Sequence, residues 1–393
     1  MTDLSPQREP PTIARRIERV SPFLAMDVLA AAGVKERRGE SVIHMELGQP
    51  SAPAPVAARE AARAALDLGK IGYTEALGIS PLRERISRHY KEAYGVSIAP
   101  ERVVVTTGSS AGFVLGFLSL FNPGARVAIS APGYPAYRNI LEALDIEPVP
   151  LTLNKADGWV MTASAIERAH SEKALQGVLA MSPANPSGSM INGAGLKAIA
   201  GFCRTNGMWF VSDEIYHGLT YGSAAETALQ FDQDAIVVNS FSKYYCMTGW
   251  RIGWIVIPRR LVRAAEMLAQ NLYISPPYLS QVAALAAFNA TEELEEVRKG
   301  YAANRVMLLQ ELPRIGIDEM HPVDGAFYIY ADIARFTNDS SAFCKRALQE
   351  AGVAMTPGLD FDPVEGHHYM RLSFAGSEND CSEAIKRLAT WLK

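Results

Sequence analysis

The segment IVVNSFSKYYCMTGWRIG, residues 236–253, decides the fold of this 393-residue chain. It opens with a continuous apolar run, Ile236–Val238, which is typical of a strand buried on both faces of a sheet. Polar residues follow at once and lead to Lys243. A second apolar run, Ile252–Ile257, begins too soon after Lys243 for a crossover helix to intervene, so we expect it to pair antiparallel with a neighbouring strand.

Runs of the same kind recur earlier, at Val103–Val105, Val127–Ile129, Val178–Met181 and Trp209–Val211. Helix-length segments separate several of them, which predicts an α/β fold with a mostly parallel sheet. The strands of a parallel sheet end at one common edge, where such folds bind ligands. The residues that follow the runs are therefore expected to meet at that edge: Ser109, Ser110, Ala111, Tyr134, Asn185, Asp213, Tyr216 and Lys243.

The length of 393 residues exceeds that of one hydrophobic core and favours two domains. We expect an N-terminal arm and helix over residues 1–45, a large domain over 46–289 and a smaller α+β domain over 290–393. Within the first part, we predict a flexible arm of about ten residues and a helix over 13–38 that packs with the small domain.

The composition restricts the class of protein. Hydrophobic residues make up 48% and charged residues 20% of the chain, as in globular proteins. The net charge of −4 argues against nucleic acid or an anionic membrane as a partner. Neither a signal peptide nor a bilayer-spanning stretch is visible, so a cytoplasmic protein is expected. The four cysteines and seven histidines lack metal-ligand spacing, which predicts no metal site.

Three motifs carry a resemblance to a known family. Ser240-Phe241-Ser242-Lys243, followed after seven residues by Arg251, resembles the S-x-S-K-x(7)-R signature of fold-type I aminotransferases. Asn185-Pro186-Ser187-Gly188 and Asp213-Glu214-Ile215-Tyr216 stand in the order and spacing of the same family, the class I/II or aspartate-aminotransferase-like enzymes that depend on pyridoxal phosphate. The resemblance covers most of the chain, from Leu47 to Arg371.

The resemblance implies the architecture, the cofactor and the partners. The fold would be type I, with a mostly parallel seven-stranded sheet flanked by helices in the large domain and a smaller α+β C-terminal domain. The cofactor would be pyridoxal 5'-phosphate. An L-amino acid and a 2-oxo acid would react in a ping-pong sequence, and the protein would be a homodimer with shared active sites.

The resemblance gives catalytic roles to Lys243, Asp213 and Tyr216. A desolvated lysine is partly neutral and attacks aldehydes, so Lys243 would carry the cofactor as a Schiff base and shuttle a proton. Asp213 would keep the pyridinium nitrogen protonated, which makes the ring an electron sink. Tyr216 and Asn185 would hydrogen-bond the phenolic oxygen and tune the basicity of the Schiff base. Taken alone, an asparagine before proline is more often a turn residue; the ordered set of motifs favours the site.

Further residues would hold the phosphate and the ring. Ser109-Ser110-Ala111 follows a strand and opens a helix, where free backbone N–H groups bind anions. The resemblance adds other cofactor contacts: Ser240, Ser242 and Arg251 at the phosphate, Tyr134 stacked on the ring, and Tyr73 at the phosphate of the neighbouring subunit.

Substrate binding would depend on Arg371, which matches the arginine that grips the α-carboxylate through its planar fork, with Gly48 and Asn185 beside it. Aspartate-type enzymes supply a second arginine, from the partner subunit, for the substrate's distal carboxylate. No lysine or arginine occurs from residue 264 to 297, where this arginine is expected. We therefore expect a neutral or apolar amino donor, with 2-oxoglutarate or pyruvate as acceptor, although Arg15 or Arg16 could supply the missing charge.

Two other functions use the same residues. A cysteine–sulfur β-lyase would share Lys243, Asp213 and Tyr216, and would release pyruvate and ammonia without a keto acid. A non-catalytic regulatory protein that binds the cofactor belongs to a different class. Such regulators carry a helix-turn-helix domain, for which the roughly forty residues before Leu47 are too few. Aminotransferase activity is therefore the leading prediction.

Overall fold

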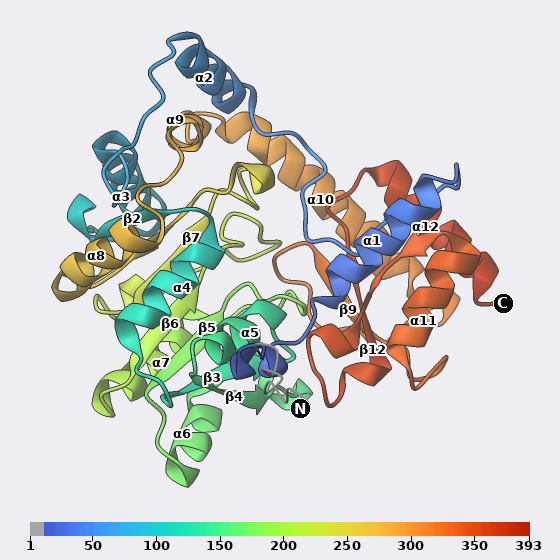
Figure 1. Cartoon of the computed structure of the whole chain (residues 1–393). Coiled ribbons are helices and arrows are strands. Elements are labelled where there is room, and N and C mark those ends of the chain that lie inside the picture. The colour runs from blue at the N-terminus through green and yellow to red at the C-terminus, as the bar shows by residue number, and fades with distance from the viewer. Residues whose placement is uncertain (1–11) are drawn as a thin grey trace, which may run out of the picture.

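The computed structural model describes residues 12–393, so the arm predicted for the first ten residues lies outside the described part. A seven-stranded sheet forms the larger part of the molecule (Figure 1). Its strands lie in the order β2 (Val103–Thr106), β8 (Gly253–Val256), β7 (Ile236–Ser240), β6 (Trp209–Asp213), β5 (Gly177–Met181), β3 (Arg126–Ala131) and β4 (Glu147–Thr152). β8 runs antiparallel to both neighbours and all other pairs are parallel. The predicted fold class and the antiparallel pairing after Lys243 are thus confirmed.

Helices cover both faces of this sheet, which is why its strands are apolar without alternation. In β7, for example, Ile236 and Val238 pack into one hydrophobic cluster and Val237 into the other. The helices are α3 (Ser80–Tyr94), α4 (Ser109–Leu120), α5 (Pro135–Ala143), α6 (Ala163–Glu172), α7 (Gly193–Thr205), α8 (Val262–Leu272) and α9 (Tyr278–Ala287). A further helix, α2 (Val56–Asp67), packs on α9 (Figure 1). α4, α5 and α8 supply the first cluster, whereas α3, α6, α7 and α9 supply the second.

The seventh strand, β4, has no counterpart among the predicted runs. Its sequence, EPVPLT, contains Pro148 and Pro150 and lacks a continuous apolar run. Proline lacks the N–H that a central strand needs, and it is tolerated in β4 because this strand is at the sheet edge and pairs only with β3.

The C-terminal part combines a small antiparallel sheet with helices. The sheet has the order β11 (Thr356–Pro357), β12 (Tyr369–Ser373) and β9 (Tyr328–Asp332). Helices α10 (Thr291–Glu311), α11 (Ser340–Arg346) and α12 (Glu378–Trp391) pack around it (Figure 1). A further short strand, β10 (Val353–Ala354), pairs parallel with β1 (Ile43–His44). The domain boundaries at residues 45/46 and 289/290 stay predictions.

The continuous helix predicted over residues 13–38 is wrong. A 3-10 turn, η1 (Arg15–Arg19), is separated from helix α1 (Leu24–Glu36) by extended residues. Pro22 explains the break, because proline disfavours helical geometry in the preceding residue and donates no hydrogen bond.

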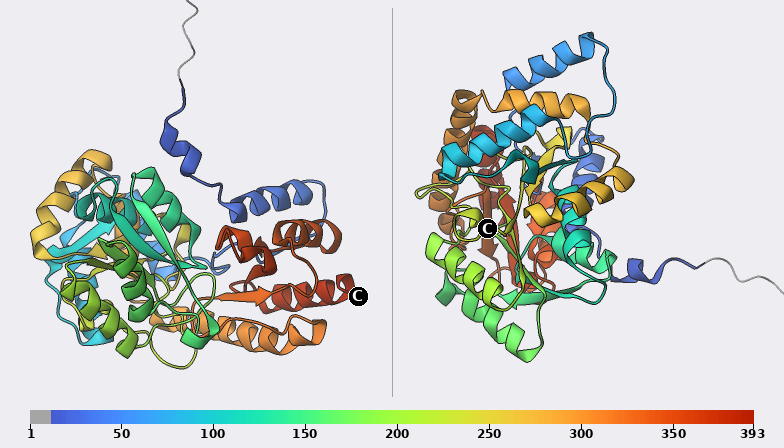
Figure 2. Two further views of the ribbon diagram at one scale, coloured as in Figure 1. Left: turned by 90° about the horizontal axis from the view of Figure 1, so that it is seen from below. Right: turned by 90° about the vertical axis from the view of Figure 1, so that its left-hand side faces the viewer.

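The N-terminal segment connects the two parts of the molecule. η1 contacts α5, whereas α1 contacts β10 and β11 (Figure 2). The first N–H groups of α1, from Leu24 and Ala25, donate to the Asp360 carboxylate at 3.0 and 3.1 Å. A carboxylate in this position satisfies free donors and complements the helix dipole. Over residues 12–393, no helix combines the length and apolar character needed to cross a membrane.

Candidate active site

A cavity of about 660 Å³ lies where the strands of the large sheet end and the C-terminal part begins. Eleven of the residues predicted from sequence line it: Gly48, Ser109, Ser110, Tyr134, Asn185, Asp213, Tyr216, Ser242, Lys243, Arg251 and Arg371. They come together because β2, β3, β5, β6 and β7 all point their carboxyl ends to this edge.

Three predicted cofactor contacts do not line the cavity of this chain: Ala111, Ser240 and Tyr73. Ala111 is buried in α4. The Ser240 hydroxyl donates to the Ile252 carbonyl at 3.0 Å and lies 2.9 Å from Ser242 Oγ. Tyr73 is 82% exposed. Its predicted role lies in a neighbouring subunit and stays a prediction.

Lys243 follows β7 and its side chain lies in the cavity, where Nζ donates to the Gly48 carbonyl. Burial, and then the charges of Arg371 and Arg251, lower the pKa of Lys243 to about 7, against an opposing effect of Asp213. A lysine with this pKa is partly neutral near pH 7 and can act as a nucleophile or a base.

Asp213 ends β6 as a buried carboxylate with two hydrogen bonds. The Ile215 N–H donates to Oδ1 at 3.0 Å, and the Tyr137 hydroxyl donates to Oδ2. Burial raises the pKa of Asp213 to about 6, although these bonds oppose the shift. Sequence reasoning missed Tyr137, which lies in the first turn of α5, three residues after the predicted Tyr134 that caps this helix.

Arg371, in β12, is 2% exposed and held from several sides. Its Nη1 donates to Asn185 Oδ1 at 3.0 Å, and its Nη2 donates to the Glu46 carbonyl and to Thr356 Oγ1. The guanidinium carbon lies 4.4 Å from the ring centre of Tyr328. Arg371 Nε has no hydrogen-bond partner among the described residues. Arg371 also lines the cavity, and a guanidinium held in place at a cavity wall suits a carboxylate ligand.

The turn before α4 forms a cradle for an anion. Gly108 has a φ of +81°, and a Cβ at this position would lie 2.4 Å from Arg251 Nη2. The positive φ and this close approach both require glycine. The free N–H groups that begin α4 and the Arg251 guanidinium thus face the same end of the cavity, which fits a phosphate.

The cavity lining also contains residues that sequence reasoning missed. They come from the N-terminal segment and from positions beside the predicted motifs: Phe23, Ala25, Met26, Leu29, Leu47, Gln49, Met181, Ile215 and Tyr328. Most are apolar, and nothing local in the sequence separates them from ordinary core residues.

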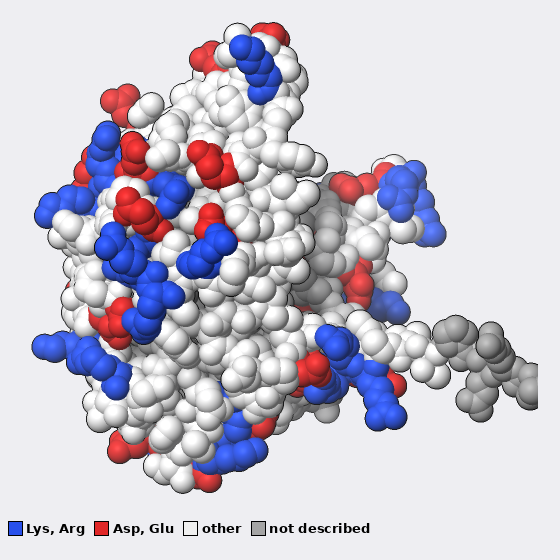
Figure 3. Space-filling model, turned by 60° about the vertical axis from the view of Figure 1, so that its left-hand side comes forward, with Lys and Arg blue, Asp and Glu red and all other residues white. Residues whose placement is uncertain are grey.

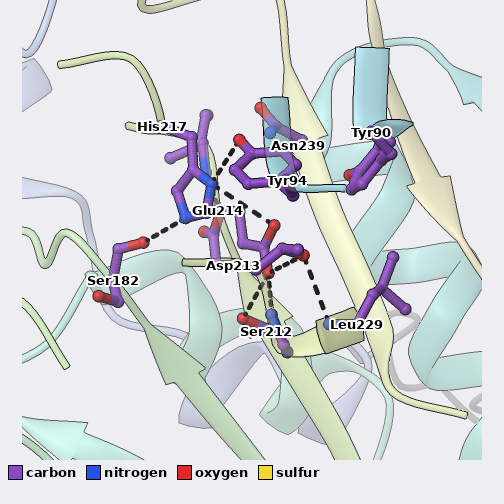
Figure 4. Close-up of polar contacts among 12 residues, drawn as sticks. Tyr90, Tyr94, Ser182, Ser212, Asp213, Glu214, His217, Leu229 and Asn239 are labelled. Carbon is purple, nitrogen blue, oxygen red and sulfur yellow. Dashed lines mark hydrogen bonds and ion pairs between the residues drawn. The ribbon is translucent and has the colours of Figure 1, made fainter. Parts of the chain in front are cut away.

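A cluster of buried polar side chains lies behind Asp213 (Figure 4). His217 Nε2 is 3.1 Å from the Ser182 carbonyl, which can only accept, so this nitrogen carries the proton. Burial lowers the pKa of His217 to about 3, and the neutral ring therefore accepts from Tyr94 at Nδ1, over 2.8 Å. Burial also raises the pKa of Glu214 to about 8. The cluster thus fixes one His217 tautomer, which holds the strand end that leads into the Asn185 loop.

Comparison with known proteins defines the class first. Residues 40–388 match the family Aminotransferase class I and II, so the chain belongs to this family, whose members depend on pyridoxal phosphate. A valine–pyruvate aminotransferase of Mycobacterium tuberculosis is 48% identical over 95% of this chain and 97% of its own length. An aspartate aminotransferase of Sulfurisphaera tokodaii is 32% identical over 96% of each chain. A crystal structure of an aminotransferase from M. tuberculosis matches with a TM-score of 0.94 and 47% identity, over 98% of this chain and 99% of that one.

The chain is therefore an amino-acid aminotransferase, as predicted, and the lyase and regulatory alternatives are not favoured.

Proposed function

We propose that this aminotransferase moves the amino group of an apolar L-amino acid, of the size of valine, to a small monocarboxylic 2-oxo acid such as pyruvate. One observation carries the proposal. The basic residues that line the cavity, among those the structure describes, are Lys243, Arg251 and Arg371. Each has a proposed task, so none of the basic residues in this chain's own lining remains for a distal carboxylate. The segment 264–297, from which a partner subunit's arginine is expected, contains no lysine or arginine. Because donor and acceptor use one site in turn, aspartate and 2-oxoglutarate are both disfavoured.

The two arginines that could have supplied the charge lie elsewhere in this chain. Arg15 and Arg16 belong to η1, which packs on α5 outside the cavity lining. Arg16 Nη2 lies 3.7 Å from Asp145 Oδ2 and its Nη1 donates to a helix carbonyl. The higher identity to a valine–pyruvate aminotransferase than to an aspartate aminotransferase supports the same choice of donor.

The cavity fits pyridoxal phosphate, which supplies an electron sink for the substrate Cα when bound. The cradle of Gly108 and Arg251 suits its phosphate, and Asp213 would stay ionised beside a protonated ring nitrogen. Lys243 would join the cofactor covalently and, once released as a neutral amine, would take the proton from the substrate Cα. Its lowered pKa suits both tasks.

Three further side chains would orient the reactants. Arg371, which lines the cavity, would bind the substrate α-carboxylate through its guanidinium group. Asn185, which already accepts from Arg371, would link this arginine to the cofactor. Tyr216 would donate its hydroxyl proton to the phenolic oxygen of the cofactor.

A homodimer with shared sites forms part of the proposal. Large apolar side chains are exposed around Tyr73 and at the end of α8: Leu66, Leu68, Ile71, Met267, Leu272 and Ile274. A broad area of the face drawn in Figure 3 carries no charged side chain. Exposed large apolar side chains such as these are typical of subunit interfaces. A cytoplasmic location stays a prediction.

Absorption spectroscopy of the purified protein tests the proposal. With pyridoxal phosphate, the wild type should show a visible band that valine, leucine or isoleucine abolishes stoichiometrically and that pyruvate restores. Lys243→Ala should lack the covalent band, whereas Lys299→Ala, at an exposed helical lysine, should behave as wild type. Fastest conversion by aspartate would refute the donor assignment. Accumulation of pyruvate and ammonia from added cysteine, without an acceptor, would indicate the lyase, because the sulfur leaves from Cβ.

A further inference from the structure

Tyr328 is a buried cavity residue to which the proposed function gives no task. It begins β9, in the C-terminal part of the chain, and is 1% exposed. Its hydroxyl lies 2.6 Å from that of Tyr216, and its ring lies under the Arg371 guanidinium at 4.4 Å. Tyr328 thus contacts both the phenol proposed for the cofactor and the arginine proposed for the substrate.

The backbone at Gly48 fixes the Tyr328 hydroxyl in this place. A Cβ at Gly48 would lie 1.7 Å from the Tyr328 hydroxyl oxygen, so only glycine leaves room for it. The carbonyl of the same glycine accepts from Lys243. The hydroxyl is therefore confined between Gly48 and Tyr216 and cannot swing into another hydrogen bond without moving the site.

The direction of the hydrogen bond between the two phenols follows from their surroundings. A phenol has one proton to donate; if Tyr216 donates toward the cofactor, it must accept from Tyr328. Burial raises the pKa of both groups, and the charge of Arg371 opposes this rise at Tyr328, while Tyr328 itself adds to it at Tyr216. Tyr328 is the stronger acid of the pair and hence the better donor.

We propose that Tyr328 is a positioning residue that orients the Tyr216 hydroxyl and couples it to the charge on Arg371; this rests on the proposed function. Hydrogen bonds in a chain polarise one another, so donation from Tyr328 strengthens donation by Tyr216. When a substrate carboxylate neutralises Arg371, the donor strength of Tyr328 falls, and that of Tyr216 falls with it. Carboxylate binding is thereby transmitted to the phenolic oxygen of the cofactor.

Tyr328→Phe tests the coupling because it keeps the ring on Arg371 and removes only the hydroxyl. The readout is the pH midpoint of the visible band of the cofactor-loaded protein, with and without isovalerate, a monocarboxylate that lacks an amine. Weaker donation to the phenolic oxygen should raise the midpoint by about half a pH unit, as for partial loss of one hydrogen bond. The shift that isovalerate produces in the wild type should also become smaller.

Tyr330→Phe is a matched control. Tyr330 lies two residues further along the same face of β9, and its ring stacks on Tyr369, outside the cavity lining. Removal of the Tyr330 hydroxyl should leave the pH midpoint of the visible band unchanged. Thermal unfolding of each variant checks that the fold is kept.

A double variant separates a positioning role from a direct one. If Tyr328 acts through Tyr216, adding Tyr328→Phe to Tyr216→Phe should shift the midpoint no further. A full additional shift would overturn the proposal, as would an unshifted midpoint in Tyr328→Phe alone. A wild-type protein that takes up no pyridoxal phosphate would refute the proposed function too, whereas a normal wild-type titration with an unshifted Tyr328→Phe refutes this proposal only.

Discussion

Gly108→Ala should damage the phosphate cradle in two measurable ways. The first is backbone strain, because φ at this position is +81° and a side chain there costs about 1–2 kcal/mol. The second is displacement of Arg251, since the added Cβ would fall 2.4 Å from Nη2. A hydrogen bond to a charged group contributes about 1.5–3 kcal/mol, so the loss of this arm should weaken cofactor binding roughly 10- to 100-fold.

Two assays separate these effects. Thermal unfolding of the cofactor-free protein reports the strain, and titration with pyridoxal phosphate, followed by visible absorbance, gives the dissociation constant. Gly116→Ala, in the same helix α4, is the matched control because nothing lies within 4 Å of its added Cβ. It should bind the cofactor normally and be neutral or more stable by about 0.5–1 kcal/mol. A Gly108→Ala protein with a lower melting temperature but unchanged affinity would refute the role of Arg251 at the phosphate.

Substitutions at three further titratable residues, Asp213, His44 and His217, make the remaining predictions. Burial raises the pKa of Asp213 to about 6 from an ordinary 3.8, so this group favours folding below pH 3.8 and disfavours it as the pH rises through 6. Asp213→Asn should therefore stabilise the cofactor-free protein at pH 8, by up to about 3 kcal/mol, but not at pH 3.5, as unfolding midpoints at both pH values would show. The same variant should lower kcat at least ~100-fold, which valine turnover measures. The hydrogen bond to Glu46 raises the pKa of His44 to about 9 from 6.5. The protonated ring therefore stabilises the folded state fully below pH 6.5, and this stabilisation is lost as the pH rises through 9. His44→Gln should cost about 1 kcal/mol at pH 6, a value reduced by the exposure of the ring, and nothing at pH 10, as thermal scans at both pH values would show. His217→Leu leaves the Ser182 carbonyl without its donor and should cost about 1–3 kcal/mol in urea unfolding, whereas His217→Gln keeps a donor near Nε2 and should recover most of it; equal losses in both variants would contradict the assigned tautomer.

The strands that are predictable from sequence are those buried on both faces. Ile236–Val238 and the similar runs are apolar throughout because helices cover each side of the sheet. β4 was not predictable in this way, because at an edge neither a continuous run nor a free N–H is required and two prolines are tolerated. Pro22 alone was enough to predict a break in the helix. The apolar residues at helical spacing on both sides of it nevertheless favoured one continuous helix, and that prediction was wrong.

The cavity was predictable where residues follow strands and unpredictable where they approach from elsewhere. Lys243, Asp213 and Asn185 lie in the cavity because strand direction alone brings them there. Tyr137 and Tyr328 depend on distances set by a helix and by the C-terminal sheet, which no local pattern encodes. Side-chain direction at a strand end is equally hidden, as Ser240 illustrates by bonding within its own loop.

The contact between α1 and Asp360 also constrains the order in which the elements can fold during synthesis. It joins residues 336 positions apart, and β1 likewise needs β10 as its partner. At synthesis rates of 5–20 residues per second, the first helix waits roughly 15–70 s for the segment that caps it. During that time the strands of the large sheet can assemble, since all of them precede residue 257. The N-terminal wall of the cavity is thus among the last elements to form, because α1 and β1 find these partners only after residues 353–360 have been synthesised.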